Sequence, residues 1–123
     1  MENNKEFIVI VTPVPKVTFT VKETNAEKML RDLQDAVDGY IEIVRPFGIS
    51  CDHLVMVVND EGLIRGLPAN PIGSLIYGDT IAGTIVIMKE GIRDGEPDLI
   101  GLTKEESDFV LRIFGGANNA KGI

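Results

Sequence analysis

The fold is decided by four consecutive stretches: FIVIV (7–11), VTFTV (17–21), TNAEKMLRDLQDAVDG (24–39) and YIEIV (40–44). The first is a continuous β-branched run, which predicts a strand buried on both faces. The second alternates apolar and polar residues, as a strand with one solvated face does, and we expect it at a sheet edge. Strands around one amphipathic helix indicate an α+β domain.

The third stretch predicts the first helix. Thr24 and Glu27 have the spacing of a capping box, whose side chains satisfy free amides of the first turn. Gly39 should supply the left-handed residue that ends the helix. The apolar residues recur at helical spacing and should face the core. They are Ala26, Met29, Leu30, Leu33 and Val37.

Further strands are expected at 54–58 and 80–88. NDEG (59–62) has the composition of a hairpin turn, with Gly62 at positive φ. Residues 63–66 should then be its short partner strand.

Two more helices follow. A short one should have Asn70 as its N-cap, Pro71 at its first position and Gly78 at its end. The last helix should open with a second capping box, formed by Thr103 and Glu106. Apolar residues of both helices are expected to face the core: Ile72, Leu75, Ile76, Phe109, Val110, Ile113 and Phe114.

Together these elements predict one α+β domain over residues 7–116. We expect a mostly antiparallel sheet of four to six strands, with two main helices and one short helix. Residues 1–6 should be a polar extension and 117–123 a flexible tail. Residues 90–101, with three glycines and Pro97, are expected to be an exposed loop.

The chain has 12 Lys and Arg against 19 Asp and Glu, a formal net charge of −7. No direct DNA binding is expected, because the basic residues are dispersed and phosphates are neutralised by clustered Lys and Arg. The dispersed acidic residues are interpreted as solubility charge rather than DNA mimicry. A single cysteine, no signal peptide and no membrane-spanning apolar run favour the cytoplasm, which is the host's if a phage encodes the chain.

Catalytic and metal-binding patterns are weak. Cys51 and His53 could share one strand face, but a structural zinc site needs four such ligands. A thiol two residues from an imidazole rarely meets it as nucleophile and base. Asp32, Asp35 and Asp38 should lie on a solvated helix face, and no glycine spacing matches a phosphate loop. No metal, cofactor or catalytic residue is expected.

The segment 59–77 is the strongest candidate for a binding site. It combines a polar turn, an arginine and a helix start, where an anion or nucleotide could be contacted. The candidate ligand-binding residues are Asn59, Arg65, Asn70, Ser74 and Tyr77. The alternative is structural: Asn70 caps the helix and Tyr77 fills the core.

Four segments together resemble a single family: DAVDGYIE (35–42), residues 54–78 with VVNDEG and GLP, DTIAGT (79–84) and LTKEE (102–106). They are similar to the "VGGYIE" signature, the centre, the "D-x-I-x-G-T" strand and the final helix of domain of unknown function family 3846. Phages, plasmids and related bacterial genomes carry that family. Asp38 replaces the first glycine of the signature, and the connection 45–52 is long. The resemblance implies a small accessory protein of a mobile element.

The sequence therefore favours a non-enzymatic accessory protein of phage or mobile-element origin. It would bind or sequester a small anionic host molecule, such as a defence nucleotide, or occupy a host protein. One alternative is a small hydrolase or transferase that uses Asp60, Glu61, Arg65 and His53. Another is a purely structural interaction domain. A homodimer or higher oligomer is expected if the 17–21 strand leaves an open edge.

Overall fold

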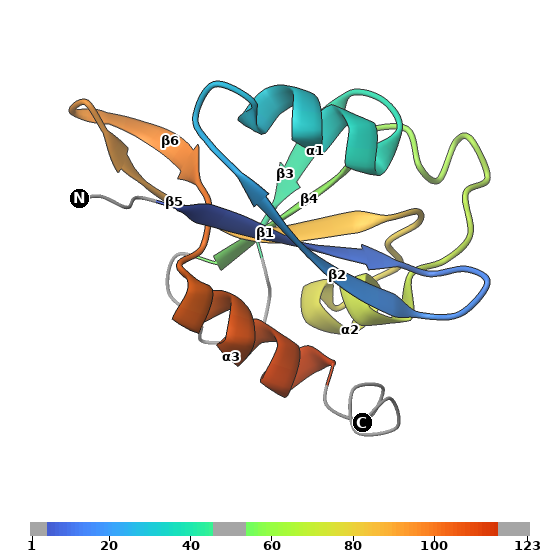
Figure 1. Ribbon diagram of the computed structural model, residues 1–123. Coiled ribbons are helices and arrows are strands. Elements are labelled where there is room, and N and C mark those ends of the chain that lie inside the picture. Colours follow the sequence, from blue (N-terminus) through green and yellow to red (C-terminus); the bar gives the residue numbers. More distant parts are fainter. Residues whose placement is uncertain (1–4, 46–53, 116–123) are drawn as a thin grey trace.

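The computed structural model describes residues 5–45 and 54–115, which form one six-stranded sheet and three helices (Figure 1). The strands are β1 (Glu6–Thr12), β2 (Thr18–Thr24), β3 (Ile41–Val44), β4 (Leu54–Asn59), β5 (Ile85–Arg93) and β6 (Glu96–Ile100). The helices are α1 (Met29–Val37), α2 (Pro71–Tyr77) and α3 (Lys104–Phe114). The sheet order is β2-β1-β5-β4-β3, β6 pairs with β5, and all these pairings are antiparallel. The predicted fold class is confirmed.

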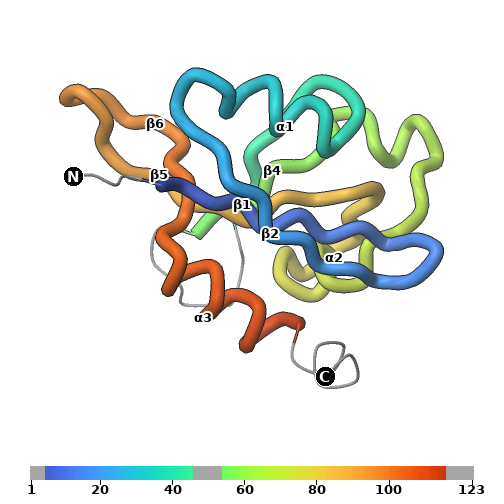
Figure 2. The backbone as a smooth tube through the Cα atoms, viewed as in Figure 1, coloured from blue at the N-terminus to red at the C-terminus, as the bar shows by residue number. Residues whose placement is uncertain are grey.

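The sheet is the middle layer, with α1 on one face and α2 and α3 on the other (Figures 1 and 2). The central strand β1 supplies both cores. Ile8 packs in the cluster that contains Leu33 of α1, whereas Val9 and Val11 pack in the cluster that contains Val110 of α3. The first strand is therefore buried on both faces, as its continuous β-branched run predicts.

The predicted capping box at Thr24 and Glu27 is wrong. Thr24 is the last residue of β2, and its hydroxyl donates to Asp32 Oδ2 over 2.6 Å. Asn25 instead accepts from the backbone amide of Lys28 in a turn before the helix. Because β2 extends through Thr24, this residue belongs to the strand and does not cap the helix. The helix α1 begins only at Met29.

Asp32 is buried, with 6% of its surface exposed, whereas a solvated position was predicted. The hydrogen bond from Thr24 lowers the pKa of Asp32, and Lys22, whose Nζ lies 3.5 Å from Oδ1, lowers it further against the opposing effect of burial. The ionised carboxylate thereby connects β2 to α1. Ala26 and Leu30, predicted in the core, are exposed.

The left-handed residue at the end of α1 is Asp38, with φ 63°, and not Gly39 as predicted. The amides of Asp38 and Gly39 both donate to the carbonyl of Gln34, at 2.8 and 3.1 Å. Asp38 occupies the position where the resembling signature has its first glycine, and glycine takes this conformation without strain. Asparagine and aspartate tolerate it better than other residues do.

Residues 63–66 form turns rather than the predicted partner strand. Gly62 does not take a positive φ; it is needed because a Cβ there would lie 2.7 Å from the carbonyl oxygen of Ala82. The turn therefore folds back against the segment that leads into β5. β5 begins at Ile85 and not at residue 80, and Gly83 has φ 90° in that preceding segment.

Residues 90–101 are a hairpin and not the predicted exposed loop. β5 continues to Arg93, and β6 returns from Glu96. Asp94 and Gly95 join them with φ 54° and 81°, the positive values that a two-residue hairpin turn requires. Pro97 lies in β6, which pairs with β5. Proline is tolerated on such an edge strand because its missing N–H is not needed for pairing with a further strand.

The two remaining helix starts are confirmed. Asn70 accepts from the amide of Gly73, and Thr103 and Glu106 form both hydrogen bonds of a capping box. The inward faces are only partly as predicted. Ile76 and Val110 are buried, but three of the predicted core residues are largely exposed: Leu75, Phe109 and Ile113.

None of the helices within 5–45 and 54–115 is long and apolar enough to cross a membrane. The predictions for Cys51 and His53, for most of the 45–52 connection and for the tail lie outside the described residues.

Candidate functional site

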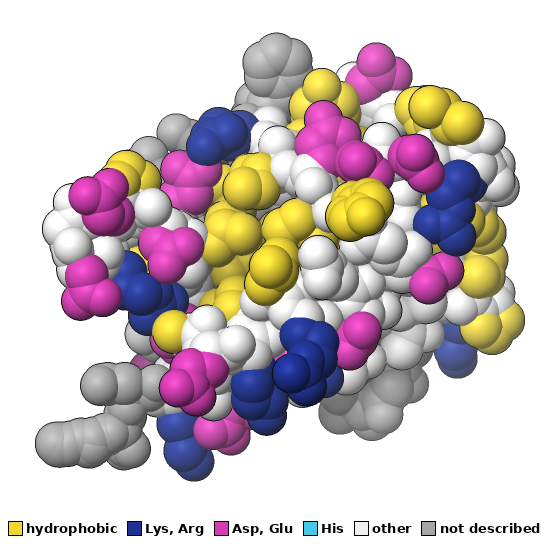
Figure 3. All heavy atoms as spheres, turned by 90° about the horizontal axis from the view of Figure 1, so that it is seen from above, with side chains coloured by type: hydrophobic (Ala, Val, Ile, Leu, Met, Phe, Trp, Pro, Cys, Tyr) yellow, Lys and Arg dark blue, Asp and Glu magenta, His cyan; other side chains and the backbone are white. Residues whose placement is uncertain are grey.

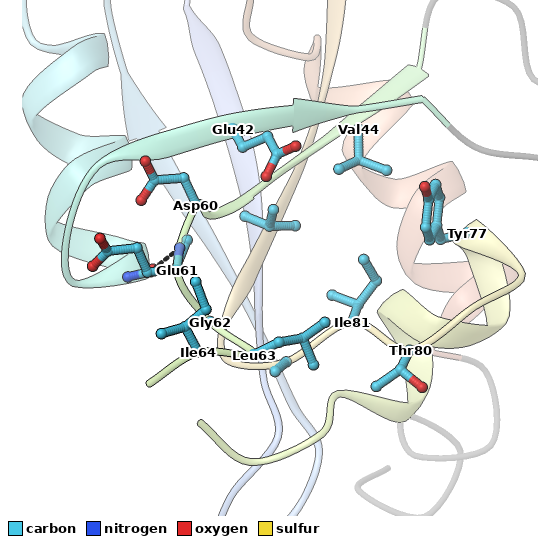
Figure 4. Close-up of a pocket in the computed structure, with 13 residues that line it drawn as sticks. Glu42, Val44, Asp60, Glu61, Gly62, Leu63, Ile64, Tyr77, Thr80 and Ile81 are labelled. Atoms are coloured by element: carbon cyan, nitrogen blue, oxygen red, sulfur yellow. Dashed lines mark hydrogen bonds between the residues drawn. The ribbon is translucent and has the colours of Figure 1, made fainter. Parts of the chain in front are cut away.

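A groove opens between the edge strand β3, the turn after β4 and the end of α2 (Figure 4). Its cavity volume is about 290 Å³. Such a volume is at the lower end of small-molecule sites and fits one or two side chains of a partner. We call this feature the β3 groove.

The floor of the β3 groove is apolar. Val58 and Ile81 belong to the buried cluster on the α2–α3 side of the sheet, and Val44 and Tyr77 pack against that cluster. Leu63 comes from the turn and is 65% exposed. The floor thus continues the core outward to the molecular surface.

Carboxylates supply the charge of the β3 groove. Figure 4 shows the Glu42 carboxylate directed into the opening, whereas Asp60 and Glu61 lie on its rim and point outward. Among the residues that the structure describes, those that line the groove include no Lys or Arg. Its potential therefore favours a cationic group and opposes an anion.

Asn59 holds the turn beside the groove in place. It is buried, and its side-chain amide donates to the carbonyls of Val37 and Asp38 at 2.9 and 3.1 Å. Its Oδ1 accepts from the amide of Glu61 at 2.7 Å. Asn59 therefore satisfies carbonyls at the end of α1 and shapes the turn that carries the rim carboxylates.

Arg65 points to the same helix end. Its Nη1 donates to the Asp38 carbonyl at 2.8 Å, and its Nη2 lies 3.2 Å from Asp38 Oδ2. It does not line the β3 groove. Arg65 and Asn59 are thus brought together, at the C-terminus of α1, where cations and donors are favourable.

Asn70 and Ser74 have structural partners. Asn70 is fully buried; its Nδ2 donates to the carbonyls of Val11 and Gly83 at 3.0 and 2.9 Å, and its Oδ1 caps α2. The Ser74 hydroxyl exchanges hydrogen bonds with the backbone of Ile81. Both side chains anchor α2, as the structural alternative for Asn70 anticipates.

Tyr77 lies at the end of α2 and forms one wall of the groove (Figure 4). Of the five candidate residues, only Asn59 and Tyr77 line the groove. Ligand binding by any of them stays a prediction.

Glu42 and Leu63 were not among the residues predicted to form the site. Glu42 was recognisable as the single charge in YIEIV, where alternation places it on the face opposite to Ile41 and Ile43. Leu63 and Ile64 form an apolar pair in a polar turn, and their assignment to a strand concealed their exposure.

A second hollow of about 260 Å³ lies between α1 and β6. Figure 3 shows apolar side chains gathered on this face, bordered by charged ones. Leu30 and Leu99 contribute to the hollow. Within the described ranges, no group of three or more His, Cys, Asp or Glu side chains could hold a metal ion.

The comparisons with known proteins identify a family and a fold. A family model described as "Domain of unknown function (DUF3846)" matches residues 5–115, so the chain belongs to that family. A search of curated proteins finds no significant match. A solved structure titled "Crystal structure of small RNA methyltransferase HEN1" is similar, with a TM-score of 0.56 and 16% identity over 85% of this chain and 15% of that one. At this identity the likeness shows the fold alone, and the chain corresponds to a small part of that protein.

Proposed function

We propose that this DUF3846 domain is a non-enzymatic accessory protein of a phage or mobile element that binds a host protein through the β3 groove. The observation that carries the proposal is the composition of the groove. An apolar floor that reaches the surface is combined with the Glu42 carboxylate, which is directed into the opening, and with no cation among the described lining residues. Apolar patches bordered by charge are typical of protein-binding surfaces.

The groove argues against the small anionic ligand that the sequence also allowed. A nucleotide phosphate placed there would face Glu42, with Asp60 and Glu61 on the rim. Arg65, the candidate cation, is held at Asp38 outside the groove. A partner with basic and apolar side chains complements this surface better.

The hydrolase or transferase alternative has less support. It needs Asp60, Glu61, Arg65 and His53 to converge on one reacting group, and His53 lies outside the described residues. The two carboxylates point outward from the rim, and the guanidinium of Arg65 is engaged with Asp38. The phage or mobile-element origin rests on the sequence resemblance, and the genes that neighbour the coding sequence would test it.

The proposal is tested with immobilised wild-type protein and two matched variants in host lysate. Leu63→Ser removes an exposed apolar residue from the groove, whereas Leu75→Ser removes one from α2 outside it. A host protein retained by the wild type is then purified, and its affinity for all three proteins is measured by calorimetry. We expect Leu63→Ser to weaken binding by about tenfold or more and Leu75→Ser to leave it unchanged.

Equal binding by all three proteins would contradict the use of the β3 groove. The same calorimetry against cyclic and linear nucleotides provides a second arm. Micromolar binding of a nucleotide would contradict the protein-binding proposal and favour the small-molecule alternative, and chemical alteration of that nucleotide would favour an enzyme.

A further inference from the structure

The outer side of β3 has backbone groups directed away from the sheet. β3 ends the sheet, and among the described strands none pairs with it except β4. The Asp60 amide donates to the Tyr40 carbonyl at 3.1 Å, so these residues form a hydrogen-bonded pair. Such pairs alternate along an antiparallel ladder. Glu42 therefore bonds inward to β4, and the amides and carbonyls of Ile41 and Ile43 face outward.

The side chains of β3 divide between two chemically different faces. Ile41 and Ile43 share the face of α1, and Ile43 is 37% exposed. Glu42 and Val44 share the opposite face and line the β3 groove. A strand added to this edge would meet Ile41 and Ile43 on one face and, on the other, the Glu42 carboxylate followed by Val44.

We infer that the partner segment binds as an extended strand antiparallel to β3, with basic residues on the face of Glu42 and apolar residues on the face of Ile43. This inference rests on the proposed function, whose groove it uses. Strand addition supplies affinity through main-chain hydrogen bonds and specificity through alternate side chains. The antiparallel direction follows the rest of the sheet, in which each strand pairing is antiparallel.

A second copy of the chain is a poor occupant of this edge. Two β3 strands paired antiparallel about Glu42 would bring together the Glu42 carboxylates of both copies, with Asp60 and Glu61 nearby. Like charges that face each other across strands are destabilising. The net charge of −7 opposes self-association further, whereas it attracts a basic partner.

The test uses a short fluorescein-labelled peptide in which lysine and valine alternate, and fluorescence anisotropy to measure its affinity for the full chain. Valines placed opposite Ile41 and Ile43 would exchange backbone hydrogen bonds with these two residues. We therefore expect methylation of the valine backbone nitrogens to weaken binding by about tenfold or more. The backbone nitrogens of the lysines face solvent in this arrangement. Their methylation should therefore leave the affinity unchanged.

Charge variants test the chemistry of the face. Glu42→Gln should weaken binding of the lysine peptide by about fivefold, as the loss of one partly exposed charge pair does. Glu42→Lys should weaken it more and should allow a glutamate–valine peptide to bind instead. Glu23→Gln, which removes an exposed carboxylate from the edge strand β2, is the matched control and should change nothing.

Several results would overturn the inference. They are no binding of the alternating peptide, equal binding of a composition-matched peptide with lysines and valines in separate blocks, and greater sensitivity to lysine than to valine methylation. Self-association of the protein alone through β3, detected by sedimentation and abolished by Glu42→Lys, would also contradict it. If the peptide does not bind but Leu63→Ser still weakens binding of the host protein, only the strand-addition mode is wrong. If Leu63→Ser has no effect on that host protein, the proposed function itself fails.

Discussion

β2 and β3, the two strands at the ends of the order β2-β1-β5-β4-β3, end the sheet in different ways. β2 is paired with β1 over all seven of its residues, and its Thr24 and Lys22 contact Asp32 of α1. β3 has four residues, all paired with β4, and its outward backbone groups border an apolar groove into which the Glu42 carboxylate is directed. Each of these strands has an outer side with which no described strand pairs, but of the two it is β3 whose outer side borders the groove. The proposed binding site is therefore placed at β3 rather than at β2.

The largest change in stability is expected from Asn70→Ala, which tests how strongly α2 is held beside the β3 groove. The substitution leaves the carbonyls of Val11 and Gly83 without their donor and removes the cap of α2. We expect the free energy of unfolding to fall by about 3 kcal/mol, since buried unsatisfied groups are costly. Chemical denaturation measures it; a loss well below this value would mean that α2 is held by other contacts.

Gly62→Ala, in the turn that forms a wall of the groove, should cause the next largest loss of stability. Its new Cβ would lie 2.7 Å from the backbone oxygen of Ala82, so the turn must move. We expect a loss of about 2 kcal/mol in thermal or chemical unfolding. Gly66→Ala is an informative comparison, because a Cβ at Gly66 meets nothing within 4 Å, although its φ of 70° adds some strain. Equal losses in both variants would argue against the close approach.

Asp32→Asn tests the link between β2 and α1 through the pH dependence of stability. The pKa of Asp32 is lowered in the folded protein, so its ionised form stabilises the fold. At neutral pH the wild type should exceed the variant by about 1 kcal/mol in unfolding free energy. The excess is fully present above the unfolded pKa of about 4 and is lost as the pH falls through the lower folded pKa. Denaturation curves at neutral and acidic pH measure it, and a difference that persists unchanged in acid would contradict the ionised link.

The smallest effect is expected from Asp38→Gly, at the turn that leads into β3. Glycine relieves the positive φ of 63° but loses the exposed pair with Arg65. The gain should exceed the loss, because exposed pairs contribute little, and we expect a net stabilisation of about 0.5 kcal/mol. Asp38→Ala keeps neither advantage and should destabilise. If the glycine variant is also less stable, the Arg65 pair matters more than the backbone.

Local signals explain which parts of the fold could be predicted. The helix starts at Asn70 and Thr103 each depend on residues within one turn, and both are present. The signal at Thr24 failed because its partner is Asp32, which becomes a neighbour only when β2 and α1 pack together. The Asp94–Gly95 turn had a recognisable hairpin composition, but the surrounding glycines and Pro97 made the segment resemble a loop.

The candidate site was harder to predict for a related reason. The segment 59–77, predicted as a ligand-binding site, supplies part of the border of the groove, but most of its polar side chains are hydrogen-bonded to backbone groups. Asn70 is the clearest case, with every hydrogen bond directed to the main chain. The groove itself joins Glu42, Leu63 and Tyr77 from three separate elements, and their proximity depends on tertiary packing that periodicity does not encode.

The most direct test of strand addition is amide hydrogen exchange of the isotope-labelled protein with and without the lysine–valine peptide. Antiparallel addition predicts that the outward amides of Ile41 and Ile43 become protected, while the exposed part of β2 exchanges as before. Protection at β2, or at the hollow between α1 and β6, with no change at Ile41 and Ile43, would contradict the account.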